Sequence, residues 1–435
     1  MSSFPSSFSS SSSSSSQIRL FLAGDFMPGR GVDAVMPSPC AREIREGFCK
    51  DAFDYARLAE QKQKRRFADT KKKVSARDVL GEVAKVIERF EPHARMLNLE
   101  TSVTKKSSFY PHKGINYRAS EENMFALLDV LKPDIVSLAN NHAMDFSREG
   151  MEDTLKFFDS IEGSSDNASL GLRVKRIGAG WNIADAMKPA VLENVYPYGF
   201  APARNDKRGV DVAAFGLCFE DSGVPREWQS TERSMGVFLA TEDDKVPERL
   251  LSAIAKMKKE SSNNAIVVVS VHFGSNWGFE VPRAHVTAAK ALVDAGADIV
   301  HGHSSHHAKT AMLYKKKLIL FGCGEFFNDY EGIRPHPGFP ETSYLGHLRL
   351  LYFVDVDAKT HNFSKLEIVL MRQKMFALTT LENPREEAEQ FLATLRQQYA
   401  AFGHLKLQLK GDGTTLIAWP DDAVRLRRRS DDDEL

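Results

Sequence analysis

The chain contains a series of short apolar runs, each followed at once by a polar or charged residue. The clearest run spans residues 135–139 and stops at Asn140-Asn141-His142. An apolar, β-branched run of this length predicts a buried strand, and the polar residues then lie at its carboxyl end. Four other runs end similarly: 18–23 before Gly24-Asp25, 95–99 before Glu100, 265–271 before His272, and 298–301 before Gly302-His303.

Helical patterns separate these predicted strands. Ser120, with two acidic residues after it, opens a predicted helix over 120–132, which ends before Pro133. Further helices are predicted over 149–159, 241–260, 282–295 and 383–401. Strands alternating with helices are typical of parallel crossover units, so we predict an α/β fold. Residues 178–219 have turns between their apolar runs, which predicts a second sheet.

Polar segments suggest how the chain is divided. Residues 1–16 are serine-rich and residues 421–435 are charged, and we expect both tails to be disordered. Residues 40–93 form a charged, mostly helical insertion, and its apolar positions over 79–90 are expected to pack on the sheet. Residues 376–420 are expected to add a helix and a strand at the carboxyl end.

Composition excludes several classes of function. The 42% of hydrophobic residues suffices for a large core, and 58 basic against 58 acidic residues leave no net charge to attract nucleic acid. No run of about 18 apolar residues predicts a membrane span, and the amino terminus lacks the features of an export signal. The four cysteines match no zinc or disulfide spacing. We therefore expect a cytoplasmic protein that holds any anionic ligand locally.

Five of the residues at strand ends are candidate metal ligands: Asp25, Glu100, Asn141, His272 and His303. Because parallel strands end together, we expect these side chains to lie along one edge of a sheet. Carboxylate, amide and imidazole groups without thiolate suit Mn, Fe or Zn. The alternative is that they are unrelated turn residues, since such residue types are ordinary in turns.

Four further residues are candidates for chemistry at such a site. A pair of metals would polarise a phosphoryl oxygen and generate hydroxide, and His142 would donate a proton to the leaving group. Arg30 has a planar guanidinium that suits phosphate or carboxylate, and with Asn276 it is expected to orient the anion. His306 is a candidate substrate-binding residue. A surface position for Arg30 is equally open.

Six motifs occur in a consistent order along the chain: Gly24–Arg30, Asn98–Thr101, Ser137–Asp145, Val271–Gly278, His301–His307 and Gly322–Gly332. Together they resemble the CapA family, which is associated with poly-gamma-glutamate (capsule) synthesis and belongs to the calcineurin-like metallophosphoesterase superfamily. The resemblance covers about residues 17–375. It implies a four-layer α-β-β-α sandwich of the metallophosphoesterase type, with two mixed sheets flanked by helices and one or two divalent metal ions at their carboxyl edge.

The resemblance also implies roles for individual residues. Asp25 stands in the place of the first-motif aspartate, Glu100 in that of the metal-bridging aspartate, and Asn141-His142 in that of the Asn-His pair. Phosphoesterases of the superfamily begin with Asp-x-His, but Met27 stands here where that histidine would be, which removes one ligand. Their last motif is Gly-His-x-His, whereas two serines separate His303 from His306. The CapA pattern shares both departures, which implies a modified site.

Three functions are therefore open. The first is a metal-dependent, phosphoesterase-like hydrolase that acts on an anionic small molecule or polymer of capsule metabolism. The second is a non-catalytic polymer-binding or synthase-accessory factor on the same fold. The third is a scaffold that has lost its metals. The sequence identifies no protein partner.

Overall fold

The computed structural model describes residues 16–67, 74–163, 172–198, 209–240, 245–333, 344–402 and 404–421. The predicted tails lie outside these residues except for their innermost positions. The described residues form a mixed α/β fold with two large sheets, as the alternation of apolar runs and helical patterns predicts. Among the described helices, none is both long and apolar enough to cross a lipid bilayer.

The first sheet has ten strands and contains the amino-terminal strand at its centre. Its order is β20 (Leu405–Leu409), β21 (Thr415–Pro420), β18 (Phe363–Lys374), β17 (Leu348–Asp357), β1 (Gln17–Phe26), β2 (Ala94–Leu99), β5 (Ile135–Ser137) and β6 (Lys175–Ile177), with β16 (Glu325–Phe327) on β1 and β19 (Ala377–Thr379) on β18. Strands β1, β2, β5 and β6 run parallel, so their carboxyl ends share one edge.

The second sheet has seven strands and a parallel centre of its own. Its order is β11 (Leu239–Ala240), β9 (Val210–Phe219), β12 (Ala265–His272), β13 (Ile299–His303), β15 (Lys317–Leu320) and β14 (Ala311–Tyr314), with β8 (Ala190–Val195) on β9. Two small sheets pair β3 (Ser102–Val103) with β4 (Arg118–Ala119) and β7 (Ala179–Gly180) with β10 (Gly236–Val237). The second sheet predicted for 178–219 is confirmed by β8 and β9.

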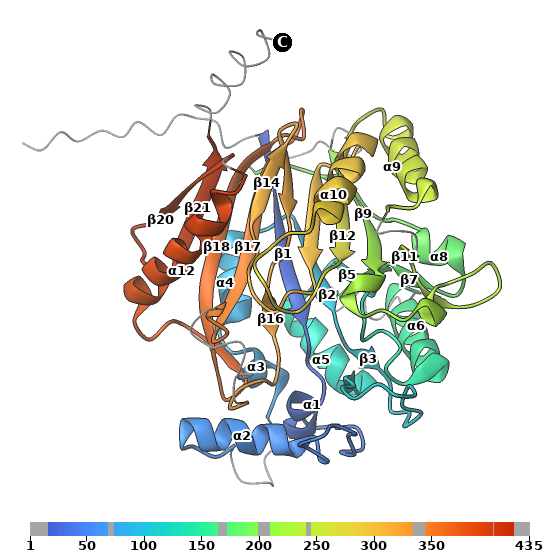
Figure 1. The fold of residues 1–435 in the computed structure, drawn as a ribbon, viewed down its shortest axis with the longest axis vertical. Helices are drawn as coiled ribbons and strands as arrows, with labels where there is room; N and C mark the ends of the chain where they lie inside the picture. Colours follow the sequence, from blue (N-terminus) through green and yellow to red (C-terminus); the bar gives the residue numbers. More distant parts are fainter. Residues whose placement is uncertain are drawn as a thin grey trace, which may run out of the picture.

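The helices lie around these sheets (Figure 1). They are α1 (Gly31–Val35), α2 (Phe53–Gln63), α3 (Ala76–Leu80), α4 (Val83–Phe90), α5 (Glu121–Leu131), α6 (Ser147–Gly163), α8 (Ile183–Met187), α9 (Glu248–Glu260), α10 (Arg283–Ala295) and α12 (Pro384–Tyr399), with short 3₁₀ turns at Glu220–Ser222 and Arg226–Trp228. Helix α5 begins where predicted, because the Ser120 hydroxyl accepts a hydrogen bond from the Asn123 N–H at 3.1 Å.

Some elements differ from the prediction for local reasons. Residues 79–90 form parts of two helices instead of one, because Gly81 has a φ of +60° and a Cβ there would meet the Leu378 carbonyl oxygen at 2.3 Å. The strand predicted over 135–139 ends at Ser137. The helix predicted from residue 241 begins only after Pro247, and residues 241–244 lie outside the described part.

Alternating side chains of β1 enter different hydrophobic clusters, as the two-residue period of a strand requires. Leu20 and Leu22 share one cluster with Val268 of β12. Phe21 and Ala23 belong to another, which contains residues of α3, α4, α5 and α6. A third cluster joins the second sheet to α8, α9 and α10. Both faces of each parallel centre are therefore buried, which fixes the positions of the strand ends.

Candidate metal centre

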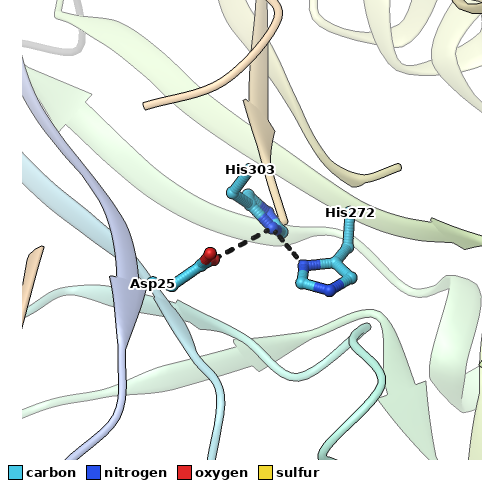
Figure 2. A group of neighbouring side chains, drawn as sticks. All are labelled: Asp25, His272 and His303. Carbon is cyan, nitrogen blue, oxygen red and sulfur yellow. Dashed lines mark hydrogen bonds and ion pairs between the residues drawn. The ribbon is translucent and has the colours of Figure 1, made fainter. Parts of the chain in front are cut away.

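Two histidines end neighbouring strands of the second sheet. His272 of β12 and His303 of β13 are paired in the parallel register, and their Nδ1 atoms are 2.8 Å apart. Both residues are fully buried, and burial lowers the pKa of each imidazole well below its ordinary value. Both rings are therefore neutral near pH 7, the form in which imidazole binds metal (Figure 2).

Asp25 of β1 faces these histidines from the first sheet. Its Oδ1 atom is 3.8 Å from His303 Nδ1 and accepts a hydrogen bond from Asn98 Nδ2 at 2.8 Å. Gly24 lets β1 pack closely against the segment that precedes β16, because a Cβ at residue 24 would lie 1.9 Å from the Gly324 carbonyl oxygen. Burial raises the pKa of Asp25 to about 6. A cation beside this carboxylate would offset the cost of burying its charge.

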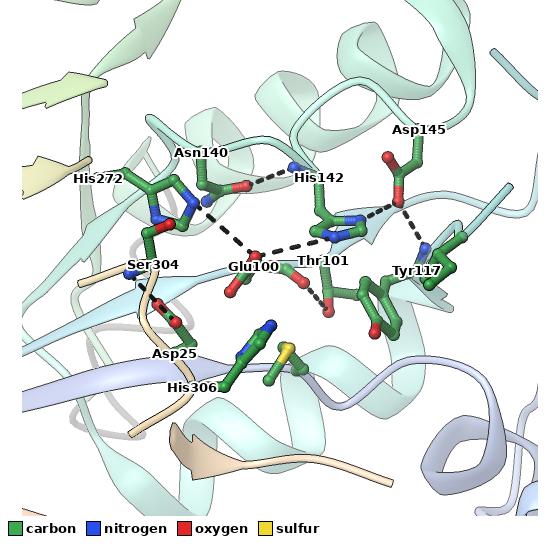
Figure 3. Close-up of polar contacts among 12 residues, drawn as sticks. Asp25, Glu100, Thr101, Tyr117, Asn140, His142, Asp145, His272, Ser304 and His306 are labelled. Carbon is green, nitrogen blue, oxygen red and sulfur yellow. Dashed lines mark hydrogen bonds and ion pairs between the residues drawn. The ribbon is translucent and has the colours of Figure 1, made fainter. Parts of the chain in front are cut away.

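Glu100 follows β2 and lies between two imidazoles (Figure 3). Its Oε1 atom is 3.8 Å from His142 Nε2 and 3.9 Å from His272 Nε2. Burial, and then the neighbouring Asp25 carboxyl, raise the pKa of Glu100 well above its ordinary value. The structure therefore gathers Asp25, Glu100, His272 and His303 into one cluster.

These four residues come from two sheets, which corrects the expectation that they share one sheet edge. Asp25 and Glu100 end strands of the first sheet, whereas His272 and His303 end strands of the second. The carboxyl ends of β1 and β12 point toward the same end of the molecule (Figure 1). The cluster therefore joins the carboxyl ends of both parallel centres.

Asn140 and Asn141 differ in their hydrogen bonds. Asn140 builds the turn after β5, since its Nδ2 donates to the Leu99 carbonyl oxygen at 2.8 Å and its Oδ1 accepts from the His142 N–H at 3.0 Å. Asn141 Oδ1 is buried and has no hydrogen-bond partner among the described residues. The sequence indicated Asn141 but gave no role to Asn140.

His142 is held in place by a charged pair that sequence reasoning missed. Its Nδ1 atom is 2.6 Å from Asp145 Oδ2, and Asp145 Oδ1 is 3.0 Å from Lys113 Nζ. Burial lowers the pKa of His142 to about 4 despite this carboxylate. The neutral ring donates from Nδ1 to Asp145, which leaves a lone pair on the Nε2 atom that faces Glu100.

His306 also faces a carboxylate that contacts a cationic side chain. Its Nδ1 atom is 3.2 Å from Glu325 Oε1, and Glu325 Oε2 is 3.4 Å from Arg349 Nη1. Its backbone N–H donates to the carbonyl oxygen of Asn276, whose residue is exposed on the loop after β12. The ring points toward Glu100 (Figure 3). Sequence reasoning missed Glu325 and Arg349 because they are distant from His306 along the chain.

Arg30 differs from the expectation that it orients an anion. Its guanidinium forms two hydrogen bonds with Asp329, and Nη1 donates to Glu46 and to the Tyr55 hydroxyl at 2.7 Å each. It lies between aromatic rings, with its Cζ atom 3.8 Å from the centre of Tyr55 and 4.3 Å from that of Tyr117. Each of its three nitrogens already donates to the protein, so Arg30 joins the segments that carry Glu46, Tyr55 and Asp329.

A serine lies behind the histidine pair. Ser270 Oγ is 2.8 Å from His303 Nε2 and 3.3 Å from His301 Nδ1. A hydroxyl that accepts from Nε2–H fixes the ring so that its Nδ1 lone pair faces Asp25. Nothing in the sequence pattern pointed to Ser270, because it stands inside an apolar strand.

The cluster has the donor set of a divalent-cation site. Asp25, His272 and His303 each place a ligand atom within 4.8 Å of the other two. Within the described residues, Glu100 Oε2, Asn141 Oδ1 and His272 Nε2 are buried without a hydrogen-bond partner. Buried polar atoms without partners are rare in proteins.

The sequence was then compared with known proteins. The model of a family described as "Bacterial capsule synthesis protein PGA_cap" matches residues 19–330. A protein of Mycobacterium tuberculosis named "Probable polyglutamine synthesis accessory protein" is 34% identical over 355 residues, which cover 82% of this chain and 84% of that protein. "Capsule biosynthesis protein CapA" of Bacillus anthracis is 30% identical over 228 residues, or 52% of this chain and 47% of that protein.

Among solved structures, the sulfate thiohydrolase SoxB in complex with glycerol matches with a TM-score of 0.36 and 13% identity, over 89% of this chain and 61% of that one. A similarity this low supports no conclusion. The family model covers most of the chain, and the motifs it spans include the residues of the cluster. The chain therefore belongs to the CapA-like family of capsule and poly-gamma-glutamate biosynthesis proteins.

Proposed function

We propose that this protein is a metal-dependent hydrolase of the phosphoesterase type that acts on an anionic compound or polymer of capsule polyglutamate metabolism. The observation that carries the proposal is the convergence of two buried carboxyls and two neutral imidazoles from four strand ends. Such a group is costly to bury unless it holds a cation. The class of polymer comes from the names of the relatives, which refer to capsule, PGA and polyglutamine synthesis.

One or two divalent ions fit the residues present. Asp25, His272 and His303 would hold one ion, and Glu100 and Asn141 offer oxygen ligands for the same ion or a second. When bound, such ions supply Lewis acidity toward a phosphoryl oxygen and toward water. We also propose the four-layer α-β-β-α arrangement. The cluster that joins α3 to α6 with the first sheet, the cluster that joins α8 to α10 with the second sheet, and the cluster shared by both sheets support it.

The chain's own residues would orient the substrate and move protons. His142 exchanges a proton at Nε2, and the Asp145 carboxylate on its Nδ1 atom keeps the ring turned toward Glu100. Lys113 balances the charge of Asp145 and brings a cation to the edge of the site. Asn276, exposed on the loop after β12, is a candidate for contact with the substrate.

A second candidate function is that of a non-catalytic accessory factor. The name of the Mycobacterium tuberculosis relative supports it, since that protein is called an accessory protein. On this alternative the cluster would hold metal for stability alone, and the polymer would bind equally well whether or not the metal ligands were intact.

Elemental analysis and an assay panel test the proposal. Protein purified without chelator should contain one or two equivalents of Mn, Fe or Zn, and with a divalent metal it should hydrolyse an aryl phosphate. His142→Ala should lose about 10²- to 10⁴-fold in kcat and retain its metal, whereas Asp25→Asn should lose both. Absence of turnover across a panel of metals and phosphoesters would overturn the hydrolase. Retention of polyglutamate that survives Asp25→Ala and His303→Ala would then favour the accessory factor.

A further inference from the structure

Two imidazoles beside the candidate metal centre each face a buried carboxylate, His142 through a hydrogen bond and His306 through an ion pair. His142 Nδ1 faces Asp145 at 2.6 Å, and His306 Nδ1 faces Glu325 at 3.2 Å. Each carboxylate in turn contacts a cation, which is Lys113 Nζ at 3.0 Å in the first case and Arg349 Nη1 at 3.4 Å in the second. A carboxylate on Nδ1 directs the opposite ring nitrogen, Nε2, away from the protein scaffold.

These two rings differ from the two histidines of the metal cluster in their access to solvent. His142 and His306 are 7% and 6% exposed, whereas His272 and His303 are 0% exposed. In Figure 3 the ring of His142 lies to the right of Glu100 and the ring of His306 lies below it. A substrate that reaches Glu100 would therefore meet both rings.

The electrostatic surroundings of His306 favour its charged form. Burial alone would lower the pKa of His306, but the Glu325 carboxylate outweighs burial and raises the pKa above its ordinary value, with a further contribution from Asp25. Arg349 acts in the opposite direction but is paired with Glu325. A protonated imidazole here can donate a proton to bound substrate.

We propose that His306 is the general acid that protonates the leaving group, with Glu325 and Arg349 as positioning residues. This inference rests on the proposed hydrolase function. In the step, the oxygen of a water molecule forms a bond to phosphorus while the ester P–O bond breaks. The electron pair of that bond goes to the leaving oxygen, which takes the proton from His306 Nε2, and the attacking water releases its own proton to the neutral His142 at Nε2.

The assignment defines the class of substrate. An acid is needed where the leaving group is an alkoxide, which is a poor leaving group, and not where it is a stabilised aryl oxide. The geometry therefore points to phosphoesters of alcohols, such as those of sugars or polyols, as the natural substrates. Aryl phosphates would be turned over with less help from His306.

The dependence of rate on the leaving group tests the role of His306. We expect His306→Asn to reduce kcat/KM about 10²- to 10⁴-fold for an alkyl phosphate and less than about 10-fold for p-nitrophenyl phosphate. Glu325→Gln should show the same selectivity with smaller losses, because it leaves the imidazole in place. His361→Asn is the matched control, since it removes a buried imidazole beside Asp298, at the opposite end of β13 from His303.

Each outcome decides a different point. Equal losses on both substrates, or no loss on either, would overturn the role as acid. Loss of bound metal from His306→Asn by elemental analysis would overturn it as well, because His306 would then be a ligand. If the wild-type protein with metal hydrolyses neither substrate, the hydrolase proposal itself fails, and this is known before any variant is compared.

Discussion

The Nδ1 atoms of His272 and His303 lie 2.8 Å apart at the ends of two parallel strands in register. Two neutral rings at this distance share one proton between them or direct two lone pairs at a common cation. Ser270 is compatible with the second arrangement, because a hydroxyl that accepts from His303 Nε2–H leaves Nδ1 as the lone-pair atom. The relationship therefore supports a metal ligand pair.

We expect His272→Ala to weaken metal binding more than about 100-fold, because it removes a ligand and not an outer partner. Chelation should lower the melting temperature of the wild type. An ion present at 1,000 times its Kd stabilises the folded state by about 4 kcal/mol, and chelation removes this stabilisation. The melting temperature of the variant should respond less, because an affinity about 100-fold weaker leaves about 1.4 kcal/mol of this stabilisation. His93→Asn, which alters a histidine bonded to the Arg19 backbone N–H, should keep the wild-type response. A variant with unchanged metal content would contradict the assignment.

Ser270→Ala tests whether the Ser270 hydroxyl orients His303 for metal binding. Without the hydroxyl, His303 can rotate or change tautomer, so the affinity for metal should fall about 10- to 100-fold while the fold is retained. The measurement is metal affinity by competition with a chromophoric chelator. Ser364→Ala is a suitable control, because Ser364 lies at the start of β18 in the first sheet, where its hydroxyl donates to the Asp355 carbonyl oxygen. Equal affinities for the wild type and Ser270→Ala would show that packing alone orients His303.

The position of the candidate site could be predicted from sequence because apolar runs mark strands strongly. Asp25, Glu100, His272 and His303 each follow or end such a run, and the structure gathers all four. Which strands pair is a different matter, since a run of valines and isoleucines does not specify its neighbour. The assignment of all five strand ends to a single sheet failed for this reason.

Residues that support the site were less accessible to sequence reasoning. Glu325 lies at the start of β16, and its partner Arg349 belongs to β17, so only the folded chain brings them to His306. Asp145 lies three residues after His142, and this spacing within one turn was available as a signal. Ser270 looked like an ordinary strand residue. Residues that meet only through tertiary contacts produce no periodic pattern in the sequence.

Arg30 is expected to contribute to stability and not to catalysis. Its two carboxylate partners, Asp329 and Glu46, are buried, and a lysine cannot reproduce the two parallel hydrogen bonds to Asp329. Arg30→Lys should therefore lower the free energy of unfolding, by less than the roughly 3 kcal/mol expected when a buried ion pair loses a partner entirely. Urea unfolding measures this loss. Exposed Arg45 provides the control, Arg45→Ala. Unchanged stability with a raised KM would instead support a role in binding the anion.

Asp134 gives the folded protein a measurable dependence on pH away from the metal centre. The carboxyl precedes β5 and accepts a hydrogen bond from the Arg95 N–H at 2.8 Å, and burial raises its pKa to about 6. Between the unfolded pKa near about 4 and this value, the folded protein binds more protons than the unfolded chain. The stabilisation that the protonated Asp134 carboxyl provides is therefore lost as the pH rises from about 4 to about 6.

Asp134→Asn removes this titration and keeps an oxygen that accepts from Arg95. Two pKa units correspond to at most about 3 kcal/mol, and partial exposure of the side chain reduces this figure. We expect the variant to match the wild type near pH 4 and to exceed its stability by about 1 to 2 kcal/mol at pH 7. Urea unfolding at several pH values measures the difference, with exposed Glu149→Gln as the control. A variant that is less stable at pH 7 would mean that the ionised carboxylate stabilises β5, because the interaction with the Arg95 backbone would then outweigh the cost of burial.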